Sequence, residues 1–285
     1  MRPLSPGTIQ KLGFGNKVGV DWALMEFLGR FAFAEWLEGL GRITVLARDA
    51  FVSFCRLNVS WKDLLYQIYF IGIKSQSVVL VTGAFTGMVL AAQTDFQFHK
   101  VKMDTATLAV VSVSMCSELG PVLTALMVAG RVGAAIAAEL GTMRVTEQID
   151  ALRTLATHPV DYLVVPRVVA SNIALPLLTV ESMCIGIGAS YVVGVYLLGI
   201  EPAYAWWNML KYSGDADVMI GLIKSMVYGG IISLIGCYKG LTCNVGAQGV
   251  GRATTEAVVY ASITILITNF FLTMTLEQVC VILGL

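Results

Sequence analysis

Charged residues are scarce in this sequence. Asp, Glu, Lys and Arg make up 13% of its 285 residues, whereas they make up about a quarter of an ordinary soluble domain. Hydrophobic residues account for 56%, and the mean hydropathy is +0.76. This composition excludes a typical water-soluble domain and indicates a membrane protein. Because the formal net charge is zero, nothing suggests a nucleic-acid partner.

Motifs for enzymatic chemistry and metal binding are also missing. The six cysteines contain no Cys-x-x-Cys pair, and the two histidines, His99 and His158, lie far apart in the sequence. The sequence has no G-x-x-x-x-G-K-[ST] phosphate loop, no G-x-S-x-G and no H-E-x-x-H. We therefore expect a non-catalytic chain with no metal site and no cofactor of its own.

Long apolar segments dominate what is present. Each is close to or above the roughly 20 residues that cross a bilayer as a helix. We expect an all-α integral membrane protein with five transmembrane helices, at approximately 68–92, 107–140, 163–199, 218–238 and 257–283. Residues 1–62 alternate apolar and charged residues at helical spacing, which favours an N-terminal amphipathic helix in the membrane interface. The same pattern also fits a soluble amphipathic helix that packs on another protein.

The loops differ in their content of Lys and Arg, which cytoplasmic loops retain. Positive residues precede the first span and follow the second and fourth spans, as in Arg48, Arg144 and Arg252. The other loops balance lysines with acids such as Asp95 and Glu201. We therefore expect a cytoplasmic N-terminus.

The second apolar segment is too long for a simple crossing. About 34 residues at 1.5 Å each make roughly 50 Å, against a hydrocarbon core of about 30 Å. Gly120-Pro121 is the expected break, because proline removes a backbone donor. Glu118 is then expected near the middle of the membrane.

A short amphipathic helix is expected after the second span. Over residues 144–155 the apolar residues share one helical face, and Pro159 ends the pattern. Such a helix fits either a lever that contacts a soluble motor or a solvated loop helix without a special role.

Three ionisable residues fall inside the spans: Glu118, Glu181 and Lys224. Intramembrane ionisable groups are candidates for function. The alternative is a structural ion pair between Glu118 and Lys224.

Several motifs together resemble one family. They are ELGPVLTALMVAGRVGAAIAAELGTMRVTEQIDAL (118–152), HPVDYLVVPR (158–167), LPLLTV (175–180), GLIKS (221–225) and GVGRATTEAVV (249–259). In this order they resemble the MlaE family, the permease subunits of ABC transporters that move phospholipid between membranes. The resemblance covers residues 64 to the end, and divides the chain into an N-terminal extension with the interfacial helix (1–62) and an MlaE-like permease domain (63–285).

The resemblance implies a non-catalytic membrane subunit and a set of partners. These are a second copy of the chain, a separate ABC ATPase that binds ATP and Mg²⁺, an MCE-domain substrate-binding protein, a small STAS-type accessory protein and phospholipid. It also implies a multi-pass protein of a bacterial inner membrane, with the plastid inner envelope as the second choice.

The resemblance further assigns residues to two roles. The helix at 144–155 looks like the coupling helix of the family, and its ATPase-coupling residues would be Glu139, Arg144, Glu147, Gln148, Asp150 and Arg252. Leu90, Glu118, Leu119 and Lys224 fall on positions similar to those that line the lipid pocket of the family at its dimer interface. Two positions depart from relatives: Ser117 replaces an arginine, and Glu181 replaces an apolar residue.

Two other functions remain open from the residues alone. Glu118, Glu181 and Lys224 also suit an ion- or proton-coupled secondary transporter that needs no ATPase. A membrane scaffold would need only the small residues that allow close helix packing.

Overall fold

The computed structural model describes residues 41–50, 52–53, 61–100, 106–155 and 158–283. The chain divides into two compact units, Met1–Val45 and Leu46–Leu285. Of the first unit only residues 41–45 are described, and they are helical. Most of the predicted N-terminal extension and interfacial helix thus lies outside the described residues, and the division at 62/63 stays a prediction.

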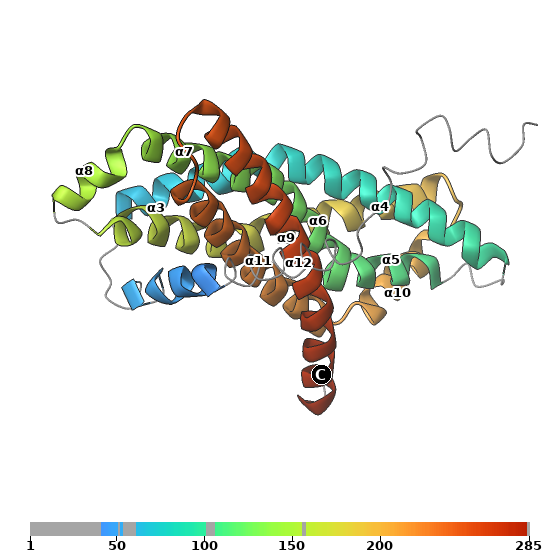
Figure 1. Ribbon diagram of the computed structural model, residues 1–285. Coiled ribbons are helices and arrows are strands. Elements are labelled where there is room, and N and C mark those ends of the chain that lie inside the picture. Colours follow the sequence, from blue (N-terminus) through green and yellow to red (C-terminus); the bar gives the residue numbers. More distant parts are fainter. Residues whose placement is uncertain (1–40, 51, 54–60, 101–105, 156–157, 284–285) are drawn as a thin grey trace, which may run out of the picture. The chain divides into compact units, whose positions relative to one another are not determined.

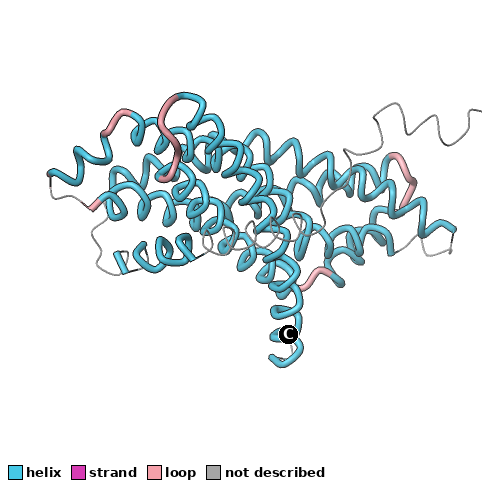
Figure 2. The backbone as a smooth tube through the Cα atoms, viewed as in Figure 1, coloured by secondary structure: helices cyan, strands magenta, loops and turns pink. Residues whose placement is uncertain are grey.

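The described residues contain helices and no strand (Figures 1 and 2). In the part of the chain that the structure describes, five helical segments are long and apolar enough to cross a membrane: Trp61–Lys100, Thr107–Val145, Val160–Tyr196, Asp215–Leu241 and Ala247–Cys280. The predicted all-α membrane fold with five spans is therefore confirmed. Two short helices join spans, α8 (Gln148–Thr154) after the second and α10 (Pro202–Tyr212) after the third.

Spans one to three combine α-helices with single π-helical turns. The first comprises α3 (Trp61–Ile68), η2 (Tyr69–Ile73) and α4 (Lys74–Lys100); the second α5 (Thr107–Ser114), η4 (Met115–Leu119), α6 (Gly120–Val128), η5 (Ala129–Gly133) and α7 (Ala134–Val145); the third η6 (Val160–Val164) and α9 (Val165–Tyr196). The fourth and fifth spans are α11 (Asp215–Leu241) and α12 (Ala247–Leu283). Single π-turns inside helices often occur at functional sites.

The break expected at Gly120-Pro121 is a change of helix type, not an interruption. The π-turn η4 ends at Leu119, and α6 continues with Pro121 in its first turn. A wider turn accommodates the proline, which has no N–H to donate and would clash with a regular preceding turn. A Cβ atom at Gly120 would overlap the carbonyl oxygen of Met115, so this geometry depends on glycine.

Helix α9 packs between α4 and α11, and α11 also packs against α7 and α12. The contact between α4 and α9 runs in parallel, because Gly83 faces Ser182 and Gly87 faces Gly186. Small residues of this kind allow close backbone approach, which membrane helices use to associate.

Replacing Gly87 by leucine is expected to destabilise this contact. A Cβ atom at Gly87 would overlap the carbonyl oxygen of Gly186, so the two helices must separate. We expect the free energy of unfolding to fall by about 2 kcal/mol or more, the usual size for overpacking. The measurement is thermal unfolding in detergent, with Gly188→Leu as the control, because Gly188 has open space around it. Equal stability of both variants would contradict the close contact.

Candidate functional site

An ion pair lies inside the membrane-spanning region. The Lys224 ammonium group, on α11, is fully buried, and it lies 2.5 Å from Glu118 Oε1, on η4. Lys224 Nζ also donates to the carbonyl oxygen of Ser117 at 3.1 Å and to Thr273 Oγ1, on α12, at 2.9 Å. The Glu118–Lys224 ion pair that the sequence offered as an alternative is therefore present. Each charge neutralises the other, which lowers the cost of placing both away from water.

Helix α12 completes the surroundings of the Glu118 carboxylate. Asn269 Nδ2 donates to Oε2 at 3.1 Å, and Thr273 Oγ1 lies 2.9 Å from Oε1. The Tyr228 hydroxyl donates in turn to Asn269 Oδ1 at 2.7 Å. The Glu118 side chain remains 33% exposed in the single chain. The group therefore joins three helices and still presents a carboxylate at the surface of the protomer.

An apolar cluster adjoins this polar group. Leu90, on α4, and Leu119, which follows Glu118, pack against a buried cluster formed by Ala91, Leu108, Val111, Met115, Ala205 and Met209. The structure therefore places two of the predicted lipid-binding residues on one apolar cluster and the other two in the ion pair. Leu119 links them, because it is the sequence neighbour of Glu118.

Glu181 belongs to a different group. Its Oε1 atom accepts a hydrogen bond from Gln76 Nε2 at 2.6 Å, on the surface between α4 and α9. The relay of Glu118, Glu181 and Lys224 that an ion-coupled transporter would use is therefore divided between two hydrogen-bonded groups.

The short helix α8 follows a sharp turn at the end of the second span. The sequence predicts one helix over 144–155, but α7 ends at Val145 and α8 begins at Gln148. Glu147 separates them in a left-handed conformation, with φ 59°. A residue other than glycine adopts this region at an energetic cost. The prediction of one continuous helix over 144–155 was therefore wrong. A pattern of apolar residues cannot show that one residue has a positive φ angle.

Charged side chains cover the outer face of α8. Asp150 pairs with Arg153 at 2.9 Å and with Arg144 at 3.5 Å, and all three side chains are at least 40% exposed. Glu147 and Gln148 are exposed, and Ile149 is buried. Ile149 therefore anchors α8, and its charged face remains open.

Glu139 and Arg252, two of the predicted ATPase-coupling residues, form ion pairs away from α8. Glu139 pairs with the buried Arg167, at the start of α9, at 2.9 Å. Glu139 thus connects α7 to α9. Arg252 binds Glu256 at 2.8 Å, and Glu256 also binds Lys239, on α11, at 2.9 Å.

The α11–α12 connection also packs on the end of α7. Cys243 lies against Gly141, where Cys243 Sγ and Val250 Cγ1 would each be 3.4 Å from an added Cβ atom. Burial raises the pKa of the Cys243 thiol, and Arg144 opposes that shift. The thiol is therefore neutral near pH 7.

The sequence did not identify some of the residues that complete these groups. Asn269 and Thr273 are four residues apart and therefore share one face of an apolar helix. This spacing is the sequence feature that could have identified α12 as part of the Glu118 group. Arg131, on η5, is another such residue: its Nη1 atom donates to Ser75 Oγ at 2.6 Å and to the Phe70 carbonyl oxygen at 3.3 Å.

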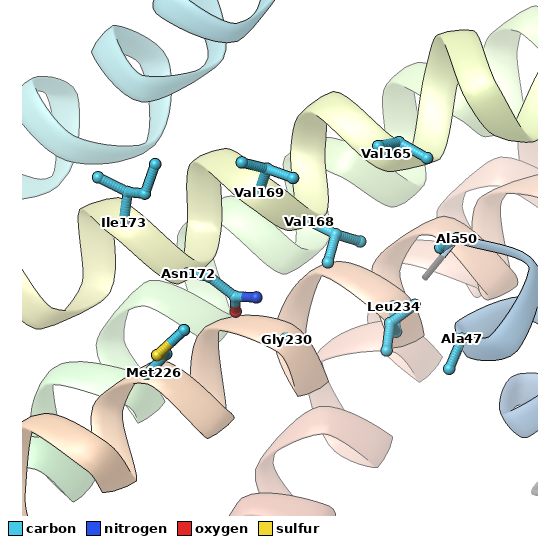
Figure 3. A pocket seen from close by; sticks show the side chains of 10 residues that line it. All are labelled: Ala47, Ala50, Val165, Val168, Val169, Asn172, Ile173, Met226, Gly230 and Leu234. Carbon is cyan, nitrogen blue, oxygen red and sulfur yellow. The ribbon is translucent and has the colours of Figure 1, made fainter. Parts of the chain in front are cut away.

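A cavity of about 470 Å³ lies between residues 47–50, α9 and α11 (Figure 3). Its walls are mainly apolar, and the Asn172 amide lies among them. The predicted lipid-binding residues do not line it. The lining residues are Ala47, Ala50, Val165, Val168, Val169, Asn172, Ile173, Met226, Gly230 and Leu234.

Among the described residues, no three His, Cys, Asp or Glu side chains gather closely enough to hold a metal ion.

Comparisons with known proteins identify a family of transporter subunits. Residues 64–275 match the family model described as Permease MlaE. A probable ABC transporter permease protein of Rickettsia prowazekii is 49% identical over 239 residues, which cover 84% of this chain and 92% of that protein. A protein of Rickettsia bellii with the same description is 45% identical over 236 residues, 83% and 91% of the two chains.

A plant protein is also similar. The chloroplastic protein TRIGALACTOSYLDIACYLGLYCEROL 1 of Arabidopsis thaliana is 37% identical over 230 residues, which cover 81% of this chain and 66% of that protein. The family match spans most of the chain, from the first membrane helix into the last. This chain belongs to the MlaE permease family of ABC transporter membrane subunits.

Proposed function

We propose that this chain forms the path by which an ABC transporter moves phospholipid between membranes. The observation that carries the proposal is the Glu118–Lys224 ion pair beside the apolar cluster of Leu90 and Leu119. Acyl chains suit apolar walls, and a few polar groups fix the orientation of a head group. The name of the Arabidopsis relative contains that of a diacylglycerol lipid, which supports a lipid as the substrate.

A second copy of the chain completes this site in the proposal. Glu118 is partly exposed although it lies within a membrane span, and α12 beside it carries exposed apolar residues such as Ile267, Phe270 and Phe271. Contact between two such faces removes the carboxylate from lipid. The lipid pocket then lies at the homodimer interface.

The energy comes from a separate ATPase in this proposal. The sequence contains no phosphate loop, and α8 offers an exposed charged face held by the buried Ile149. A groove of an ATP- and Mg²⁺-binding partner receives α8. An MCE-domain protein outside the membrane and a small STAS-type protein complete the assembly. We place it in a bacterial inner membrane, with the N-terminus cytoplasmic.

Replacing Leu119 by tryptophan is expected to block transport without unfolding the protein. The larger side chain takes up apolar space next to Glu118, and we expect the same of Leu90→Trp, because Leu90 packs against the same cluster. We expect phospholipid transfer by the complex, purified through a tag on this chain and reconstituted in liposomes, to fall at least about tenfold; such a loss corresponds to about 1.4 kcal/mol or more.

The matched control is Leu197→Trp, because Leu197 is exposed at the end of α9. Transfer at the normal rate in both Leu90→Trp and Leu119→Trp would place the lipid path elsewhere. Transfer of an ion without an ATPase would instead favour the secondary transporter.

A further inference from the structure

The lysine of the Glu118–Lys224 pair has no hydrogen-bond donor left for a ligand. A lysine ammonium group has three N–H donors. Those of Lys224 bind the carbonyl oxygen of Ser117, the Oε1 atom of Glu118 and the Oγ1 atom of Thr273. The Lys224 side chain is also fully buried. A phosphate group in the site would therefore find no free donor on this lysine.

The Glu118 carboxylate, in contrast, has acceptor capacity left. Within the described residues, Oε1 is bound by Lys224 and Thr273, whereas Oε2 accepts only the hydrogen bond from Asn269 Nδ2 at 3.1 Å. Each carboxylate oxygen can accept two hydrogen bonds. The Glu118 side chain is 33% exposed, and that of Lys224 is not exposed at all. The pair is neutral as a whole, but the end that a ligand can reach is the negative end.

A hollow of about 440 Å³ lies along α5, between the outer end of the second span and Glu118. Among the described residues, it is lined by Ala106, Ala109, Val110, Val113, Ser114 and Tyr212. None of these six side chains is charged. Ser114 precedes Glu118 by four residues, which makes about 6 Å along the helix axis. A lipid that enters along this hollow therefore passes uncharged walls before it reaches the carboxylate.

We propose that Glu118, as part of the proposed lipid path on which this inference rests, selects phospholipids whose head group carries an ammonium group with at least one N–H. Phosphatidylethanolamine is the simplest of these lipids. Its ammonium group donates a hydrogen bond to Glu118 Oε2, and a bond of this kind between charged groups is stronger than one between neutral groups.

Two other classes of head group lack what this carboxylate requires. A choline head group has the same charge as ethanolamine, but its quaternary nitrogen has no N–H to donate. A glycerol head group has hydroxyl donors but no cation, so its phosphate places an uncompensated negative charge near Glu118. Repulsion between like charges is stronger inside a membrane than in water, because the dielectric constant is lower there.

Competition between head groups tests the proposal. Five lipids with identical acyl chains and the head groups ethanolamine, monomethylethanolamine, dimethylethanolamine, choline and glycerol are supplied in equal amounts. They are added to the complex, purified through a tag on this chain and freed of native lipid, and the bound lipid is counted by native mass spectrometry. Lipid in the site is defined as the amount that Leu119→Trp removes.

We expect the three head groups with an N–H to occupy the site to a similar extent, because one free acceptor position needs only one donor. Choline and glycerol head groups should occupy it at least about tenfold less, the effect of one hydrogen bond to a charged group. The decisive step in the series is therefore the one from dimethylethanolamine to choline, which removes the last N–H and keeps the charge.

Two substitutions at Ser117 separate charge from size. This side chain is partly exposed, and the carbonyl oxygen that Lys224 binds belongs to the backbone and stays in place. Ser117→Arg adds a guanidinium group beside Glu118 that can bind phosphate, so the glycerol head group should bind at least as well as ethanolamine. Ser117→Gln adds a long polar side chain without a charge and should keep the preference for ethanolamine.

The double substitution Glu118→Gln with Lys224→Met removes the charges themselves. The preference for ethanolamine over choline should then fall below about threefold, because only a neutral acceptor remains. An unchanged preference in this variant would overturn the proposal, since the selection would not come from Glu118.

Two results with the unaltered complex would also overturn the proposal. They are equal occupancy by the dimethylethanolamine and choline head groups, and a preference for the glycerol head group. If all five lipids bind equally and Leu119→Trp removes them all, the lipid path stands and only the selection by Glu118 fails. If Leu119→Trp removes none of them, the lipid path fails, and the selection fails with it.

Discussion

Reversing two charges on α8, with Glu147→Lys and Asp150→Lys together, is expected to lower the ATP hydrolysis that depends on this chain by at least about tenfold. Like charges placed across an interface cost several kcal/mol. Asp150 also lies between Arg144, at the end of α7, and Arg153, on α8, so a lysine there brings three positive charges together. The measurement is the amount of ATPase that co-purifies with the tagged chain, together with its lipid-stimulated turnover.

The membrane fold should survive this double substitution. Both side chains are exposed, and the anchor Ile149 is unchanged. The matched control is Glu201→Lys with Asp215→Lys, which makes the same change of charge at exposed positions at the N-termini of α10 and α11, on the predicted outer side. Normal ATPase binding and turnover in the α8 variant would remove α8 from the coupling interface.

Hydropathy predicted the spans because it reports directly on the membrane. It did not predict their ends: the first apolar segment was expected at 68–92, and the helical segment runs over Trp61–Lys100. Backbone hydrogen bonds continue past the point where residues such as Asp95 and Lys100 meet water, so a helix is longer than its apolar part. Helix α10 was missed for a related reason, because it is only Pro202–Tyr212 and does not cross the membrane. Its Trp206 and Trp207 are typical of the membrane interface.

The charged part of the site could be inferred from the sequence, because charges inside a membrane are costly unless they are paired. Charges inside a membrane must find partners, so Glu118 and Lys224 could be paired although 106 residues separate them. Neutral polar residues give no such signal. Asn269 and Thr273 add little to the free energy of inserting an apolar helix into the membrane. Their role becomes visible only in the fold, which places them beside the Glu118 carboxylate.

The pairing of Glu139 with Arg167 shows the opposite case. Both residues were visible as charges near the inner ends of their spans, and either could have reached water. Their pairing depends on the angle between α7 and α9, which no local pattern contains. The left-handed Glu147 is similar, since its φ angle follows from how α8 must turn to bury Ile149.

Replacing Lys224 by methionine is expected to cost the most stability. The ammonium group is fully buried, and its loss leaves the Glu118 carboxylate with Asn269 and Thr273 but without a counter-charge. Removing one partner of a buried pair costs about 3–5 kcal/mol. We expect a loss of this size in the free energy of unfolding, measured by thermal unfolding in detergent, and phospholipid transfer reduced at least about tenfold.

A double substitution, Glu118→Gln with Lys224→Met, separates the structural role of the pair from its role in transport. It removes both charges, so most of the stability lost in Lys224→Met should return, because replacing a whole buried pair is often neutral. The amide that replaces the Glu118 carboxylate would keep one acceptor oxygen for Asn269 Nδ2, and its NH2 group could donate to Thr273 Oγ1. If the pair only holds helices together, transfer recovers with stability. If the charges contact the lipid head group, as we propose, the protein is stable and transfer remains low. Full transfer by the stable double variant would therefore remove Glu118 and Lys224 from the lipid path and leave them as the link between η4, α11 and α12.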